Sequence, residues 1–137
     1  MYQRDYLLNE ARKFAQLLAR LMGLKTEGNE DVFVQEFNQA LQDEYDMELA
    51  QLLNLSQPDF KTRLQETDYS AEKLNALSQM LYVFAQPFAH NDDTILLLKK
   101  VLLIFDILEQ KHHFDSFENI DKRKTIFRFL NTTYERP

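Results

Sequence analysis

Glycine and proline are scarce in this sequence of 137 residues, and cysteine and tryptophan are absent. Glycine and proline are the residues that most often end helices, because glycine frees the backbone and proline lacks an N–H. Long stretches can therefore stay helical between the few interruptions, which are Gly23, Gly28, Pro58, Pro87 and Pro137. The lack of cysteine excludes disulfides, thiolate metal sites and cysteine nucleophiles.

Long apolar runs are also missing. The most apolar stretch, residues 95–108, is shorter than the roughly 20 residues that a spanning helix needs, and it contains Lys99, Lys100 and Asp106. The opening MYQRDYLLNEARK has neither the uninterrupted apolar segment nor the small-residue cleavage site of a secretory signal. We therefore expect a soluble protein of the cytoplasm.

Enough apolar side chain is present to form a core, since 45% of the residues are hydrophobic and eleven are phenylalanine. A domain of this length buries roughly two-thirds of the surface that its unfolded chain exposes. We expect one domain over residues 1–137. Within it, residues 1–25 are predicted to form a basic amphipathic helix and residues 132–137 a frayed tail.

The net charge of −6 is unevenly distributed. Residues 1–25 contain five Lys/Arg and two acidic residues, a net charge of +3. Residues 26–72 contain two Lys/Arg and twelve acidic residues (−10), and residues 73–137 contain nine Lys/Arg and eight acidic residues (+1). The acidic middle argues against nucleic-acid binding, because neutralising phosphates requires clustered Lys and Arg. The basic first helix can instead attract the acidic middle, within one chain or between two chains.

The spacing of apolar residues predicts an all-α fold of six or seven helices, packed as antiparallel hairpins. The first helix is expected at 5–22, a second from 30 to a break at 43–46, and a short third at 47–54. A fourth is expected from 57 to a break at 66–68, and a fifth from 71 to about 86. A sixth should lie between turns at 90–93 and 112–115, and a last one from 117 to 131. We favour two helices over residues 30–54 rather than one. Residues 95–108 are apolar nearly all round, so that helix is expected to be the central one.

Residues typical of helix ends mark most of these boundaries. Gly23 is predicted to form a left-handed C-terminal cap. The predicted N-caps are Asn29, Ser56, Ser70, Asp92 or Asp93, and Ser116. For the last helix, the residues available for packing are Ile120, Ile126, Phe127, Phe129 and Leu130.

Three segments carry a resemblance to a known family: YQRDYLL at 2–8, FAQLLAR at 14–20 and LSQPD at 55–59. They resemble a family of small, uncharacterised bacterial all-helical proteins, in which a Q-x-D-Y-[IL] opening leads into an amphipathic helix and tetratricopeptide-like hairpins. The likeness extends over most of the chain and implies helical hairpins, but it implies no activity. The period of about 34 residues of a regular tetratricopeptide array is not seen. Plain hairpins and a degenerate array therefore both stay open.

Glu109 and His112 form an E-x-x-H spacing, which places both side chains on one face of a helix. Di-iron bundles use two such motifs and two further glutamates, whereas this sequence has one. His113 and Asp115 are additional ligand candidates, yet histidines here also suit the negative end of a helix dipole. The interpretation we favour is a solvated helix terminus.

A second candidate is His90 as a base with Asp92 and Asp93 as its carboxylate partners. A capping turn explains the two aspartates better. Ser56, Ser70 and Ser116 lie at predicted caps and are not credible nucleophiles, and the glycines lack the spacing of a phosphate-binding loop. We predict no catalytic, cofactor-binding or metal-binding residue and no cofactor.

The leading functional hypothesis is a non-enzymatic protein–protein interaction module that holds a peptide or partner helix in a groove between hairpins. The acidic stretch 27–48 favours basic partners. A membrane-surface role for the first helix, with Arg12, Lys13 and Arg20 opposite its apolar stripe, is disfavoured relative to packing of that stripe in the core. The alternatives are a ligand- or metal-binding bundle with enzymatic activity that uses His90, Glu109 or His112, and a structural homodimer.

Overall fold

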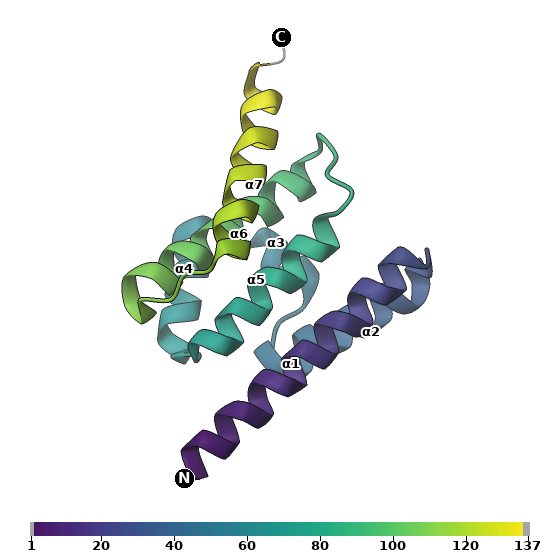
Figure 1. Ribbon diagram of the computed structural model, residues 1–137. Helices are drawn as coiled ribbons and strands as arrows, with labels where there is room; N and C mark the ends of the chain where they lie inside the picture. Colours follow the sequence, from purple (N-terminus) through teal and green to yellow (C-terminus); the bar gives the residue numbers. More distant parts are fainter. Residues whose placement is uncertain (1, 136–137) are drawn as a thin grey trace. The chain divides into compact units, whose positions relative to one another are not determined.

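Helices account for nearly all of the backbone from residue 2 to residue 135, which is the part of the chain that the structure describes, and no strand occurs within it (Figure 1). Side chains are described for residues 8–131. The computed structural model contains α1 (Tyr2–Thr26), α2 (Glu30–Tyr45), α3 (Leu49–Asn54), α4 (Gln57–Thr67), α5 (Ala71–Ala85), α6 (Asp92–His112) and α7 (Phe117–Glu135). The prediction of an all-α fold with six or seven helices is confirmed, as is the division of residues 30–54 into two helices.

The chain separates into two compact units, which meet in sequence between Leu55 and Ser56. In the first unit α1 packs against α2, and the short α3 follows. In the second unit α6 packs against α5, α4 and α7. Each unit therefore contains one hairpin of consecutive helices, α1–α2 and α5–α6. A tetratricopeptide-like array stays a prediction.

The end of α1 differs from the prediction. The helix does not stop at Gly23 but continues to Thr26, and Gly28 is the glycine with positive φ, at 75°. The Asn29 N–H donates to the Leu24 carbonyl at 3.0 Å and the Gly28 N–H donates to the Lys25 carbonyl at 3.2 Å, which is the Schellman pattern. Leu24 is buried, so one more helical turn places an additional apolar side chain in the core.

The two glycines should respond in opposite ways to alanine. Gly23→Ala should raise the free energy of unfolding by about 0.5–1 kcal/mol, because glycine inside a helix costs about that much relative to alanine. An added Cβ meets nothing within 4 Å at either position. Gly28→Ala should lower the free energy of unfolding by about 1 kcal/mol, because alanine is strained in the left-handed region. Urea denaturation followed by circular dichroism measures both, and shifts of the same sign would contradict the assigned helix end.

The other predicted helix starts are largely correct. The hydroxyls of the three serines accept from backbone N–H groups three residues later, at 3.2, 3.1 and 3.1 Å, and the serines are Ser56, Ser70 and Ser116. Asn29 precedes α2 as predicted, although its side chain accepts no capping hydrogen bond. The prediction for α6 was wrong, because Asn91 is the cap and accepts from the Thr94 N–H at 2.8 Å. Asp92 and Asp93 fall in the first turn instead, where carboxylates stabilise the helix dipole.

Only one edge of the predicted apolar stripe of α1 is buried in the core. Phe14 and Leu21 are buried, whereas Leu8 and Met22 are 56% and 54% exposed. Ala11 and Ala15 lie on this exposed edge as well. The prediction that the stripe packs in the core therefore holds for half of its width.

The core of the second unit is centred on α6, as predicted for residues 95–108. Buried α6 side chains are Thr94, Leu97, Leu98, Lys100, Val101, Ile104, Phe105, Ile107 and Leu108. α4 contributes Phe60 and Leu64, and the Gln57 amide donates to the Lys99 carbonyl at 3.0 Å. The tail predicted to fray from residue 132 is helical to Glu135, while residues 136–137 lie outside the described part of the chain.

Candidate interaction surface

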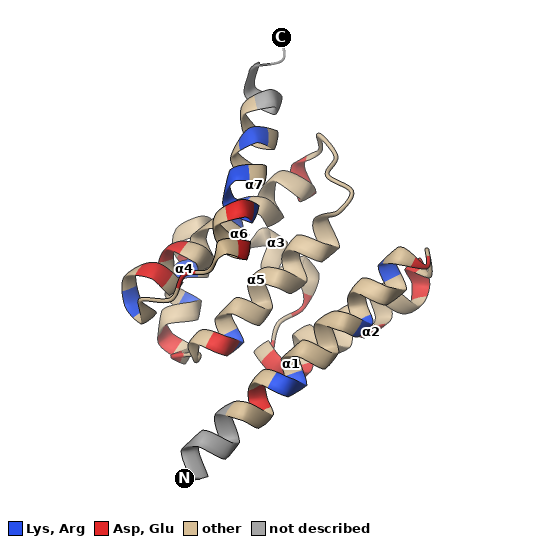
Figure 2. Ribbon diagram, in the orientation of Figure 1, with Lys and Arg blue, Asp and Glu red and all other residues tan. Residues whose placement is uncertain are grey.

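α7 is held on the second unit by one of its faces. Ile126, Leu130 and Asn119 are buried on this inner face. At its edge the Arg123 guanidinium donates to Asp106 on α6 at 2.9 Å and lies 3.4 Å from Glu109, one turn further along α6. In Figure 2 acidic and basic residues lie close together where α7 passes α6. The ion pairs fix how α7 is rotated about its own axis.

A polar cluster joins α7 to α5. The Asn119 carboxamide accepts from Gln79 Nε2 and donates to Asn75 Oδ1, both at 2.9 Å. Gln79 Nε2 also lies 3.1 Å from the hydroxyl of Ser78, which is fully buried and donates to the Asn75 carbonyl at 2.6 Å. Because buried polar groups are costly unless they are hydrogen-bonded, this cluster favours one position and orientation of α7 on α5.

An aromatic cluster holds the middle of α7. Phe88, in the turn after α5, lies edge-on to Tyr82 and to Phe129, with ring centroids 5.4 and 5.3 Å apart. His90 stacks on Phe129 at 4.6 Å. Burial raises the pKa of the Tyr82 phenol, and Lys122 Nζ lies 5.4 Å from its ring centroid. Together with the polar cluster, these contacts make α7 a supported and well-oriented helix.

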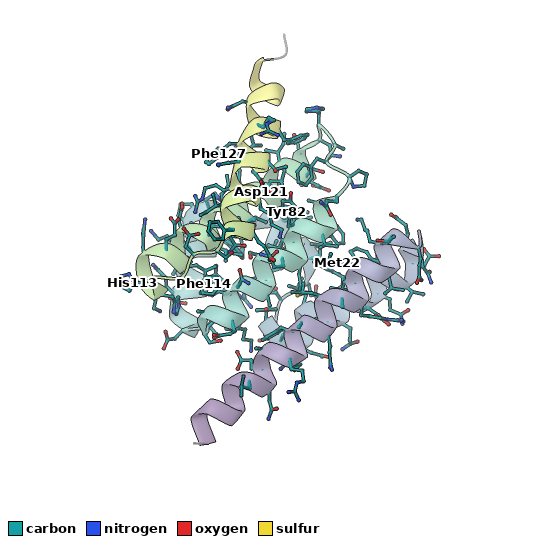
Figure 3. All side chains as sticks on the ribbon, viewed as in Figure 1. Met22, Tyr82, His113, Phe114, Asp121 and Phe127 are labelled. Carbon is teal, nitrogen blue, oxygen red and sulfur yellow. The ribbon has the colours of Figure 1, made fainter. Side chains whose placement is uncertain are left out.

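The opposite face of α7 carries large apolar side chains that the second unit does not cover. Phe117 is 92% exposed, Phe127 47% and Ile120 37%. We call this surface the α7 outer face, and its residues are Phe117, Ile120, Asp121, Lys124, Phe127 and Arg128, all exposed. Asp121 and Phe127 are labelled in Figure 3. An open hollow of about 210 Å³ adjoins its start, lined by Asp115, Ser116, Phe117 and Ile120.

Part of the prediction for α7 was wrong. Ile126 and Leu130 pack as predicted, and Phe129 takes part in the aromatic cluster, but Ile120 and Phe127 face solvent. The helix has two apolar edges, and only one of them can face the core. The sequence signal for the outer face is the 3-4-3 spacing of residues 117, 120, 124 and 127, which is the spacing of a coiled-coil seam. The buried positions 119, 126 and 130 are not part of this seam.

The E-x-x-H residues are not brought together as a ligand set. Glu109 is turned to Arg123, and His112 Nε2 is buried without a hydrogen-bond partner among the described residues. His113 is the left-handed cap of α6, and Asp115 accepts from the Ser116 N–H at 2.9 Å. Across residues 8–131, no three His, Asp or Glu side chains lie where they could hold one metal ion.

The second candidate, His90 with Asp92 and Asp93, is divided between two environments. His90 belongs to the aromatic cluster on α7. Asp92 and Asp93 line an open hollow of about 360 Å³ at the start of α6, with Asn91, Thr94 and the end of α5. The structure therefore places the aspartates in the first turn of α6, after the cap residue Asn91.

The basic first helix does meet acidic residues, and it does so within the first unit. Lys13 Nζ lies 2.9 Å from Glu44, and Arg20 makes a bidentate pair with Glu36 at 2.9 and 3.0 Å. The hydrogen bonds from Arg20 lower the pKa of the Glu36 carboxyl. The predicted attraction between the first helix and the acidic stretch is thus present inside one chain. None of the described helices combines the length and the apolar character required to cross a membrane.

Lys100 is a buried cation that sequence reasoning did not single out. Its side chain is 1% exposed, and Nζ lies 5.5 Å from the centroid of the Phe60 ring. Burial lowers the pKa of its ammonium group. Lys100 therefore belongs to the contact between α4 and α6.

Comparison with protein-family models, curated proteins and solved structures found no match to this chain. The assignment of function therefore depends on the site itself, and the feature of the described residues that most resembles a binding site is the α7 outer face.

Proposed function

We propose that this protein is a non-enzymatic protein–protein interaction module that docks a helix of a protein partner onto the α7 outer face. The observation that carries the proposal is the exposure of Phe117, Ile120 and Phe127 in one stripe on a firmly supported helix. Contiguous exposed apolar side chains with charged neighbours are typical of protein interaction sites. Aromatic residues and arginine are also enriched at interface cores, where a few anchors carry most of the binding energy.

The support of α7 from within strengthens the proposal. Asn119, Arg123 and Phe129 hold the inner face through hydrogen bonds, ion pairs and ring contacts. A partner that binds a preorganised surface avoids much of the entropy cost of ordering it. The surface is a helix face with a hollow at its start, so it differs from the groove between hairpins that the sequence suggested.

Two further parts of the hypothesis accompany this proposal. A basic partner for the acidic stretch 27–48 would need the acids that remain after Glu36 and Glu44 have paired with α1. A location in the cytoplasm fits the cysteine-free composition, because disulfides are rare there. The likeness to small bacterial helical proteins is in keeping with both.

Site-specific photo-crosslinking tests the proposal. A photoreactive residue replaces Phe127 on the α7 outer face, and a matched variant carries it at Gln65, an exposed position of α4. We expect a discrete protein adduct, to this or another protein, from position 127 and none from position 65. With the partner purified, Phe127→Ala should weaken binding at least tenfold, or about 1.4 kcal/mol. Equal adducts from both positions, or none from position 127, would refute the proposal.

A further inference from the structure

We propose that the helix docking on the α7 outer face is α7 of a second copy of this chain, lying antiparallel to the first about a two-fold axis. The inference rests on the proposed function of that face and names its partner. It follows from how charge and apolar side chains are arranged along α7.

The charges on the outer face are complementary to themselves. Asp121 and Arg128 are both exposed and lie seven residues apart, which is two helical turns and about 10.5 Å along the axis. The point between Lys124 and Thr125 lies midway between Asp121 and Arg128 in sequence, and we place the two-fold axis there. An antiparallel pair about this axis places each Asp121 beside Arg128 of the partner subunit and so forms two ion pairs. In a parallel pair the two Asp121 side chains would lie on opposite sides of the interface and out of reach of Arg128 of the partner subunit, so only the antiparallel arrangement forms these ion pairs.

The apolar side chains interlock about the same axis. An axis between positions 124 and 125 places position 127 of one copy opposite position 122 of the second copy. Position 122 lies midway between positions 120 and 124 of that second copy. Phe127 then inserts between Ile120 of the partner subunit and the stem of Lys124 of the partner subunit. This is the knobs-into-holes packing that a 3-4-3 spacing allows. Phe127 and Ile120, which the second unit leaves exposed, become buried together.

Lys124 limits the strength of the pair. It lies next to the axis, so the two Lys124 ammonium groups approach one another, and their long stems must carry the charges out to solvent. One helix from each copy also makes a small interface. We therefore expect a weak, concentration-dependent dimer, in which Lys124→Met tightens association because it removes the repulsion and keeps the apolar stem.

The other exposed apolar stripe offers no such complementarity. On α1 the stripe of Leu8, Ala11, Ala15 and Met22 is flanked by the exposed base Arg12, but seven residues further on the sequence has Ala19 and no acid. The α7 outer face, in contrast, has an acid and a base at equivalent positions on either side of its centre. A second copy therefore matches an acid with a base on both sides of the two-fold axis.

Charge exchange between two variants tests this arrangement by sedimentation equilibrium of the full chain. The wild type should shift with concentration from 16.4 kDa toward twice that mass. Asp121→Arg alone and Arg128→Asp alone should each weaken self-association at least about tenfold, since each creates two like-charge pairs. An equimolar mixture should associate about as well as the wild type, because both ion pairs are restored across the mixed dimer. Glu118→Arg, an exposed change of the same charge on α7 outside the outer face, is the matched control.

The outcomes separate this inference from the proposed function. Variants that self-associate like the wild type, or a mixture of folded variants that stays monomeric, would overturn the antiparallel pair. A monomeric wild type whose position 127 crosslinks to a different protein would overturn the second copy as occupant and leave the interaction module intact. A wild-type chain that stays monomeric and gives no adduct from position 127 would overturn both the antiparallel dimer and the proposed function. Circular dichroism of each variant establishes that it is folded.

Discussion

Leu98→Ala is expected to lower the free energy of unfolding by about 3–4 kcal/mol, as for large buried side chains whose removal leaves a cavity. Leu98 is fully buried on α6, the helix on which α4, α5 and α7 all pack. The neighbouring helices α4 and α5 each begin at a serine cap and also pack on α6, so they can only partly close the space. Urea denaturation followed by circular dichroism gives the change from the transition midpoint.

Leu96 provides the matched control for this substitution. It lies on α6 two residues earlier but is exposed, so Leu96→Ala should cost less than about 1 kcal/mol. Equal losses from the two leucines would contradict the placement of α6 as the centre of the second unit.

Asn119→Ala is expected to destabilise the protein by about 1–3 kcal/mol, because its two partly buried partners each lose a hydrogen bond. Gln79 Nε2 loses an acceptor and Asn75 Oδ1 loses a donor, each at 2.9 Å in the native structure. Gln79 keeps its contact with Ser78 at 3.1 Å, which limits the loss. The free energy of unfolding is measured as for Leu98→Ala.

Asn131→Ala on the same helix is the control, since position 131 is exposed and should change stability by less than about 0.5 kcal/mol. A double-mutant cycle with Asn75→Ala isolates the coupling across α5 and α7. A coupling energy near zero would mean that the polar cluster does not hold α7, and the support assumed for the α7 outer face would then be lost.

A weak self-association through α7 would give this protein a concentration-dependent state. The same side chains that stabilise the pair would be exposed at low concentration and covered at high concentration. Because Asp121 and Arg128 are exposed, the ion pairs between copies should weaken with salt, as surface charge interactions do.

The helices and most of their ends were predictable from the sequence because they depend on interactions a few residues long. The three serine caps form hydrogen bonds to N–H groups only three residues away, and the apolar all-round pattern of residues 95–108 predicts a buried helix by itself.

The end of α1 and the cap of α6 required the tertiary structure. Gly23 and Gly28 are both credible helix ends by local criteria. Burial of Leu24 favours the longer helix, which places the left-handed turn at Gly28. Asn91, Asp92 and Asp93 are three adjacent residues with similar capping preference, so their local chemistry did not identify the cap.

By itself the sequence determined an all-α protein of six or seven helices with most of their bounds, since helix formation and capping are local. It also showed that Ile120, Ile126, Phe127 and Leu130 of α7 are available for packing. Only the tertiary structure decided which edge faces outward. Asn75 and Gln79 on α5, and Asp106 and Glu109 on α6, bind Asn119 and Arg123, and so they rotate Ile126 and Leu130 inward. That choice depends on partners 14 to 44 residues away in sequence, which local patterns along α7 do not contain.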